Sequence, residues 1–276
     1  MGESRIGGWI LIGPAAVLLG LLGAAVASML AASLAAPTSG PTLAYYQRFL
    51  SDPTYLAYIS RSFRVAFYTT AGALLLGYPV AYTMSRVSAR TRRLLVLVLV
   101  LQFFSVNVTR VYALILLLGN NGAINRALLG LGWIDSPIPL IYDEFGVAVG
   151  LISSALPFAV FPIATVLGRI SPSLREAAQT LGASRTRIFW EIAFPLSLPG
   201  VSASVTVVFL YSLGAFATPL LLGGGFVDLI AVFAYDQAVN LSNYGFAAAG
   251  AVVTLGCAFL AIYAFNRCLE RWIPGK

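Results

Sequence analysis

A short polar segment between two apolar stretches holds six residues whose types and spacing suit docking against another protein. They are Glu176, Ala177, Ala178, Gly182, Ile192 and Pro195. A carboxylate can bind an arginine of a partner, small side chains allow close approach, and a glycine permits a left-handed turn. A short, rigid loop of this kind could transmit movement from a partner. The alternative is that the glutamate caps its own helix and the alanines are simply good helix formers.

The segment around these residues predicts two short helices. Ser171 followed by Pro172 is a typical helix start, Ser173 and Glu176 fit a capping box, and Gly182 is a typical helix end. Ser184 is a good cap for a second amphipathic helix, which we expect to stop at a proline eleven residues on. Together they form a compact knob over residues 171–195.

Several charged and aromatic residues could line a path for a solute. Arg110 lies within an apolar run, where an ionisable side chain is costly unless it faces a wet cavity or a partner. It is therefore either a site residue or an anchor that reaches the interface or pairs with Asp143. The predicted path residues are Arg110, Tyr112, Phe216, Asp228 and Asp236.

The two aspartates of that set flank an apolar stretch, and with neighbouring aromatic rings they could form a vestibule that favours amines. Ordinary solvated loop charge is the simpler interpretation of both. Tyr82, Tyr211 and Tyr263 stand near the ends of apolar runs and are interpreted as interfacial belt residues.

The elements that must position these residues are membrane helices. Of 276 residues, 59% are hydrophobic and 10% charged, whereas soluble domains carry about 25% charged residues. Each membrane span needs about 20 mostly apolar residues. Six such runs are predicted, over residues 8–34, 65–84, 94–118, 145–167, 198–222 and 244–265. The first is too long for a cleaved leader and is interpreted as a retained helix.

Arginine and lysine in alternate loops predict the orientation of the chain. With the N-terminus inside, 12 of the 17 basic residues fall on the cytoplasmic side, so both termini and the knob are expected there. The net charge of +7 is explained by this asymmetry, which removes the reason to expect a nucleic-acid partner. The chain has no histidine, the commonest residue of metal sites and acid-base catalysis, so we expect no metal and no catalytic site.

The six docking residues resemble the signature E-A-A, three residues, G, nine residues, I-x-L-P of bacterial binding-protein-dependent permeases, the membrane subunits of ATP-binding-cassette importers. Phe194 stands where that signature usually has leucine, which keeps an apolar side chain there. Segments near Arg110 to Gly132 and near Leu213 to Gly223 look like the polyamine-type branch, and the similarity runs from about Ser60 onward. The long first helix resembles the first of the two paired permeases.

The resemblance implies an all-α membrane protein with six transmembrane helices and the type I importer fold. It also implies an assembly with a second homologous permease, two ATP-binding-cassette ATPase subunits and an extracytoplasmic solute-binding protein in the bacterial inner membrane. The six signature residues would couple to the ATPases, which would hold ATP and magnesium. This chain would need no cofactor and would not be an enzyme, since it has no phosphate-binding loop and its only lysine is Lys276.

Other functions fit the composition less well. A gradient-driven transporter or channel predicts an internal repeat, which is not evident in the two halves, and needs no docking knob. The lack of histidine and of clustered acidic residues within the apolar runs argues against a membrane enzyme, whereas a scaffold stays open. Within the importer class, polyamines are the expected solutes, and opines, phosphonates or iron complexes are the alternatives.

Overall fold

The computed structural model describes residues 3–36 and 40–270 of the chain. They divide into two compact units. The terminal unit contains the residues up to Ala57 together with Phe233–Gly256, and the core unit contains Tyr58–Val232 and the residues from Cys257 onward.

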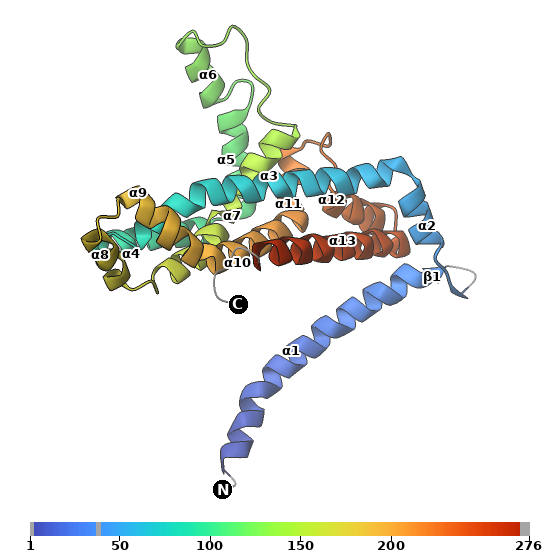
Figure 1. The fold of residues 1–276 in the computed structure, drawn as a ribbon. Coiled ribbons are helices and arrows are strands. Elements are labelled where there is room, and N and C mark those ends of the chain that lie inside the picture. The colour runs from blue at the N-terminus through green and yellow to red at the C-terminus, as the bar shows by residue number, and fades with distance from the viewer. Residues whose placement is uncertain (1–2, 37–39, 271–276) are drawn as a thin grey trace. The chain divides into compact units, whose positions relative to one another are not determined.

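The described residues are almost entirely helical (Figure 1). In chain order the elements are α1 (Glu3–Leu34), β1 (Ala35–Ala36), β2 (Gly40–Pro41), α2 (Ala44–Ser51), α3 (Pro53–Met84), α4 (Ala89–Phe104), α5 (Asn107–Leu118), α6 (Ala123–Gly130), α7 (Glu144–Leu167), α8 (Pro172–Thr180), α9 (Arg185–Ile188), the π-helical turn η1 (Phe189–Ala193), α10 (Phe194–Leu213), α11 (Ala217–Leu222), α12 (Ile230–Tyr235), the π-helical turn η2 (Asp236–Asn240) and α13 (Tyr244–Glu270). The two strands form a two-residue antiparallel pair.

Five of these helices are long and apolar enough to cross a membrane, and a bent helix pair would make a sixth span. The all-α membrane fold predicted from the sequence is therefore confirmed. The second span differs in length, because α3 begins at Pro53 and the sequence predicted a start near residue 65. The side chain of Asp52 accepts a hydrogen bond of 2.8 Å from the Thr54 amide, which caps the longer helix.

The third span is broken, whereas the sequence predicted one helix over residues 94–118. Helix α4 ends at Phe104, α5 begins at Asn107, and the two parts of the run bend by 98°. Ser105 and Val106 both adopt extended backbone angles at the break. Apolar composition marks this run as membrane-embedded but does not reveal where its helix stops.

The fifth run is also interrupted. Helix α10 ends at Leu213, Gly214 follows as its C-cap, and the short helix α11 begins at Ala217. The prediction of a continuous helix over 198–222 was wrong for this reason.

The second helix of the knob does not stop at Pro195, contrary to the prediction. Helices α9 and α10 join through η1 into one helical segment over Arg185–Leu213. In the π-helical turn the amide of Phe194 bonds the carbonyl of Phe189, five residues back. Such a widened turn changes the hydrogen-bond register just before the proline, which has no amide hydrogen to offer.

Helix α7 continues through Pro157 because a distant side chain satisfies the backbone. A proline leaves the carbonyl four residues earlier without its helical donor, and for Pro157 that residue is Ser153. The side-chain amide of Gln102 in α4 donates to the Ser153 carbonyl. This is the compensation that allows prolines within membrane helices.

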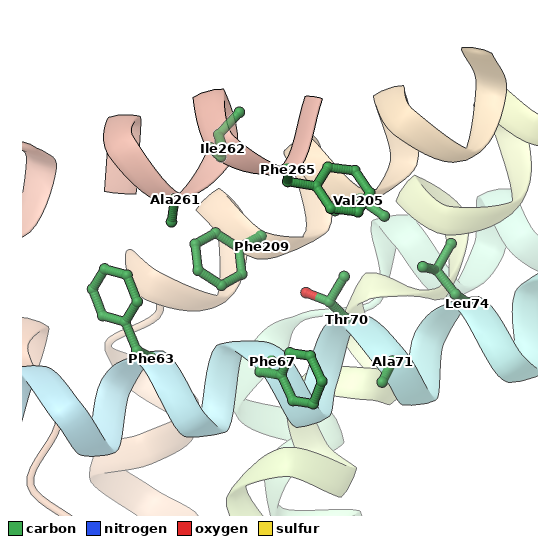
Figure 2. Close-up of a pocket in the computed structure, with 10 residues that line it drawn as sticks. All are labelled: Phe63, Phe67, Thr70, Ala71, Leu74, Val205, Phe209, Ala261, Ile262 and Phe265. Atoms are coloured by element: carbon green, nitrogen blue, oxygen red, sulfur yellow. The ribbon is translucent and has the colours of Figure 1, made fainter. Parts of the chain in front are cut away.

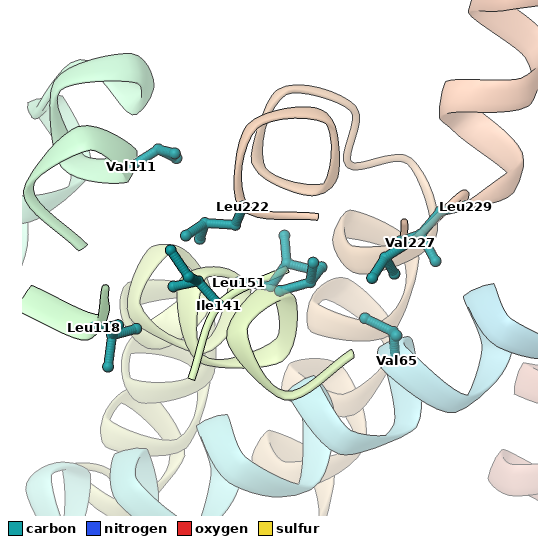
Figure 3. Packing of buried hydrophobic residues seen from close by; sticks show 9 residues of the cluster. Val65, Val111, Leu118, Ile141, Leu151, Leu222, Val227 and Leu229 are labelled. Carbon is teal, nitrogen blue, oxygen red and sulfur yellow. The ribbon is translucent and has the colours of Figure 1, made fainter. Parts of the chain in front are cut away.

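Two apolar clusters hold the core unit together. One joins the early part of α3, α5, the start of α7 and α11 (Figure 3), and its members are Val65, Val111, Leu118, Ile141, Val147, Leu151, Leu222, Val227 and Leu229. The other joins the end of α3 to α4, the end of α7 and η1, through Ala81, Met84, Leu99, Val160, Ile163, Leu167 and Ala193. The second cluster lies at the end of the core unit where α8 and α9 are found (Figure 1).

The terminal unit contains an aromatic cluster. Phe49 is fully buried and packs against Tyr55, Phe233 and Phe246, with ring centroids 5.6 to 5.9 Å apart. The guanidinium of Arg48 lies 5.0 Å from the Phe246 ring centroid, a cation–π distance. Within α1 most side chains of the span Gly13–Leu34 are exposed, and Ser33 near its end is buried.

Candidate functional site

The first helix of the knob, α8, begins where the sequence predicted but is capped differently. Ser171 is its N-cap and Pro172 its first residue, yet the Ser171 hydroxyl contacts the Ser173 hydroxyl, 2.6 Å away, and caps no amide. Glu176 is the fifth residue of this helix, too far along for a capping box. The predicted capping box was wrong for this reason. It requires Ser173 as the N-cap, whereas the helix begins at Pro172 with Ser171 as the N-cap, two residues earlier.

The side chain of Glu176 is exposed and makes no hydrogen bond or ion pair with any residue that the structure describes. It therefore does not cap its own helix. Ala177 is exposed beside it, and Ala178 is half-buried. An unpaired carboxylate next to small side chains is accessible to a basic residue of a partner.

Gly182 ends α8 in a left-handed conformation, with φ at +80°. Its amide bonds the Gln179 carbonyl at 2.9 Å, and the Ala183 amide bonds the Ala178 carbonyl at 3.0 Å. This pair of bonds is a Schellman motif, which closes the helix and reverses the chain. A Cβ at Gly182 would have nothing within 4 Å, so only the backbone conformation requires glycine here.

Helix α9 follows directly. The Ser184 hydroxyl accepts a hydrogen bond of 3.2 Å from the Arg187 amide, as the sequence predicted for a cap. Arg187 and Glu191 then form an ion pair of 2.9 Å on the exposed side.

A groove of about 240 Å³ lies between the two helices of the knob. It brings together two of the six signature residues, Ala178 and Ile192, along with Leu181. Leu181 leaves 88% of its surface exposed, which is unusual for a large apolar side chain in a polar loop. Leu181 was not predicted from the sequence as a functional residue, although an apolar residue directly before a helix-ending glycine is a detectable signal.

Within the core unit, aromatic packing anchors the knob to α3. The Phe189 ring lies 5.1 Å from the ring of Tyr82 and 5.9 Å from that of Tyr78, both on α3. The Tyr78 hydroxyl also contacts the Ser197 hydroxyl in α10, at 2.9 Å. Because α9 is continuous with α10 and wedged against α3, a displacement of the knob cannot be absorbed by a loose linker.

A second feature is a polar groove of about 350 Å³ where the two broken spans meet. Asn107, the first residue of α5, lines it together with the end of α10, the Gly214–Phe216 break and the start of α11. Tyr211 also lines this groove and packs against Phe158 with centroids 5.2 Å apart. The prediction that Tyr211 is a belt residue does not fit this position.

The predicted path residues do not all gather at this groove. Phe216 lines it, whereas Arg110 and Tyr112 do not. Tyr112 is 55% exposed. Asp228 is half-buried in the loop after α11, and Asp236 is an exposed residue of the other unit, where it accepts a hydrogen bond of 2.9 Å from Asn240.

Arg110 acts as an anchor, which was one of its two sequence-based interpretations, but its partners differ from those that the sequence predicted. Its guanidinium donates to the carbonyls of Gln102, at 2.8 Å, and Ser105, at 2.9 Å, and so binds the end of α4 across the break. Asp143, its expected partner, instead caps α7 by accepting a hydrogen bond of 2.8 Å from the Gly146 amide. The polar residues within 105–109 were the sequence signal for this break. They include Asn107, which also lines the polar groove.

An apolar groove of about 440 Å³ between α3, α10 and α13 is a poor candidate for a solute path (Figure 2). Phe63, Phe67 and Phe209 dominate its walls. Its one hydroxyl, that of Thr70, donates to the Ala66 carbonyl at 2.7 Å. Among the described residues that line this groove, Thr70 has the only polar side chain, and one hydroxyl cannot replace the hydration shell of a charged solute.

Comparison with known families decides the class. Residues 73–273 match the model of the family described as "binding-protein-dependent transport system inner membrane component". This chain belongs to that family. The matched residues include the knob, both helix breaks and the polar groove. The signature loop of the permease therefore lies within the part of the chain that matches the family.

Curated relatives of the permease are membrane components of the same kind. It is 33% identical over 233 residues to the spermidine/putrescine transport system permease protein PotB of Escherichia coli K12, covering 83% of this chain and 84% of that protein. The PotB protein of Haemophilus influenzae is 31% identical, with 80% and 79% covered. A putative 2-aminoethylphosphonate transport system permease protein of Salmonella typhi is 25% identical, with 76% and 73% covered.

Solved structures confirm the fold. The permease matches a chain of the crystal structure of a bacterial alginate ABC transporter in complex with an alginate pentasaccharide-bound periplasmic protein, with a TM-score of 0.74. Identity is 17%, and the match covers 96% of this chain and 98% of that chain. The permease is thus a multi-pass inner-membrane component of a binding-protein-dependent ABC importer.

Proposed function

We propose that the permease conducts a polyamine of the spermidine or putrescine class. Transport is driven by ATP hydrolysis on separate subunits that bind the knob. The observation that carries the coupling half of this proposal is the unbroken helical segment Arg185–Leu213, which joins the docking surface to a membrane span. Relatives named as spermidine/putrescine permeases at 33% identity support the choice of solute.

The complete importer in this proposal contains a second homologous permease, two ATP-binding-cassette subunits that hold ATP and magnesium, and an extracytoplasmic solute-binding protein. The knob and both chain termini lie in the cytoplasm. The arginine count of alternate loops supports this orientation, although Arg271 and Lys276 lie outside the described residues.

The six signature residues form the coupling site in this proposal. Glu176 offers the unpaired charge, Ala177 and Ala178 the close approach, and Gly182 the reversal that turns the knob. Ile192 lines the groove, and Pro195 lies where the docking segment enters the membrane span. Leu181 would insert into an apolar recess of the ATPase.

The solute path in this proposal runs past the groove at the two helix breaks. Aromatic faces attract ammonium groups, and amide or hydroxyl oxygens replace part of their hydration shell. The groove offers Phe216, Tyr211, Asn107 and Thr218 for these purposes. Carbonyl groups at the ends of interrupted membrane helices also attract cations. Of the remaining predicted path residues, Tyr112 and Asp228 of the core unit are proposed to line the outer approach. Asp236, which belongs to the terminal unit, is proposed separately as a contact of the solute.

The coupling half is tested by Glu176→Lys in the assembled importer. Uptake into proteoliposomes and solute-stimulated ATP hydrolysis should both fall at least tenfold, while solute binding to the soluble receptor is unchanged. Gln179→Lys is the control, because it places a lysine at an exposed position of the same helix without removing the carboxylate of Glu176. Normal uptake by the Glu176 variant, or uptake without any ATPase subunit, would reject the assignment.

The solute half is tested by Tyr211→Ala with labelled spermidine and putrescine. Uptake should fall several-fold through a higher apparent KM while the complex still assembles. Tyr263→Ala is the control, since that ring is 66% exposed and does not line the groove. If neither polyamine enters and an opine, a phosphonate or an iron complex is transported instead, the proposed solute is wrong. The coupling assignment would be unaffected by that result.

A further inference from the structure

Helix α4 carries a further groove, which has a charged end and an apolar remainder. It has a volume of about 350 Å³ and is lined by Arg92, Arg93, Val96, Leu97 and Val100. None of these residues belongs to the knob groove or to the groove at the helix breaks.

The spacing of these residues places them on one face of the helix. Val96 is four residues after Arg92, Leu97 four after Arg93, and Val100 four after Val96, so each lies one turn beyond the last. From Arg92 to Val100 the face extends along about 12 Å of helix axis. The apolar part is open, since Leu97 is 53% exposed while Val96 and Val100 are half-buried.

The two arginines have no counter-charge of their own. Both side chains are exposed, and neither forms an ion pair with any acidic residue in the part of the chain that the structure describes. Two further arginines are close in sequence: Arg86 lies in the turn before α4, and Arg90 is the second residue of α4. Two neighbouring guanidinium groups suit an oxyanion, and phosphate, like carboxylate, is one that arginine binds in a bidentate manner.

The position of the groove selects the source of that phosphate. Helix α4 is the first half of the bent helix pair that is long and apolar enough to cross a membrane. The two arginines are its fourth and fifth residues. A free anion would leave the apolar face of Val96, Leu97 and Val100 uncovered. An amphiphile with its phosphate at the arginines would cover that face with an acyl chain.

We propose that this face of α4 binds an anionic glycerophospholipid, with the headgroup phosphate on Arg92 and Arg93 and an acyl chain along Val96, Leu97 and Val100. Basic sites at the ends of membrane helices are suited to such lipids, and each arginine near a charged membrane surface contributes about fivefold in binding. The inference does not depend on the identity of the transported solute.

The test uses the assembled importer in phosphatidylcholine nanodiscs containing a trace of photoactivatable phosphatidylglycerol. The lipid should crosslink to α4, and Arg92→Gln/Arg93→Gln should reduce that crosslink about thirtyfold. Arg90→Gln removes one positive charge from a position that does not line the groove and should leave the crosslink within about twofold, whereas Arg92→Gln or Arg93→Gln alone, which also removes one charge, should reduce it about fivefold. Leu97→Gln keeps both arginines and should weaken the crosslink several-fold, which tests the acyl-chain half.

Competition distinguishes the sources of phosphate. Unlabelled phosphatidylglycerol should displace the probe, whereas phosphatidylcholine and inorganic phosphate should not. The proposal is overturned if phosphatidylcholine competes equally, if Arg90→Gln matches the double variant, or if α4 stays unlabelled because a partner subunit covers it. Single variants Arg92→Gln and Arg93→Gln replace the double variant if that one fails to assemble.

Discussion

The guanidinium of Arg110 donates a hydrogen bond of 2.8 Å to the carbonyl oxygen of Gln102, across the 98° bend between α4 and α5. The side chain of the same glutamine donates to the Ser153 carbonyl, which Pro157 has left without its helical donor. Gln102 therefore links two irregular points in neighbouring spans. The bend beside the polar groove is held by side chains, not by a loose loop.

Replacing Arg110 by alanine should destabilise the complex before it affects solute recognition. Two carbonyls would lose charge-assisted hydrogen bonds, each contributing about 1.5 to 3 kcal/mol. We expect a lower thermal unfolding midpoint and reduced maximal uptake with little change in apparent KM. Arg126→Ala removes an equal charge from an exposed helix without such contacts and should be neutral. A raised KM at unchanged stability would instead make Arg110 a solute contact.

At position 182 there is room for a larger side chain, but the left-handed backbone conformation disfavours any residue with a Cβ. Since a Cβ there meets no atom within 4 Å, Gly182→Ala should cost only the left-handed conformation, about 1 to 2 kcal/mol. Gly182→Asn should cost less, because asparagine enters this region more readily. The rate of solute-stimulated ATP hydrolysis should be lowest for Gly182→Ala, intermediate for Gly182→Asn and highest for the wild type. Equal loss in both would indicate that the bare glycine surface itself contacts the ATPase.

Gly200 should be intolerant of any side chain, because α7 and α10 pack there backbone to backbone. An added Cβ would lie 2.9 Å from the Pro162 carbonyl oxygen and 3.0 Å from the Ile163 Cα. Gly200→Ala should therefore lower the free energy of unfolding by about 1 to 3 kcal/mol. Gly256→Ala is the matched control, since it lies in a helix with open space around it and should be neutral or slightly stabilising. Thermal unfolding of the purified complex compares the two.

Asn125 organises the loop after α5. Its side chain is fully buried, donates to the carbonyls of Gly119 and Ile138, and accepts from the Ile138 amide at 2.9 Å. Asn125→Ala would leave these groups unsatisfied, at a cost of about 1 to 3 kcal/mol for each buried one. We expect a lower unfolding midpoint and faster proteolysis within residues 119–142. Asn120→Ala, at an exposed neighbouring position, should change neither; a stable Asn125 variant would mean that water replaces the side chain.

Apolar composition alone determined that this is a membrane protein, roughly where its spans lie, and that a polar knob separates the fourth and fifth. A run of 20 apolar residues has few alternatives to a membrane helix, because every backbone group must be satisfied within the bilayer. The cap at Ser184 and the left-handed Gly182 were likewise predictable, since both depend on neighbours only a few residues away. The family resemblance rested on the same short signature.

Only the tertiary structure decided where the helices break and which side chains meet there. The break after Phe104 is held by Arg110, and Gln102 satisfies a carbonyl 51 residues away. The continuation through Pro195 depends on a π-helical turn wedged by Phe189 against α3. Local sequence shows how polar a residue is, but a helix in a bilayer stops or continues according to whether a distant group supplies the missing hydrogen bond.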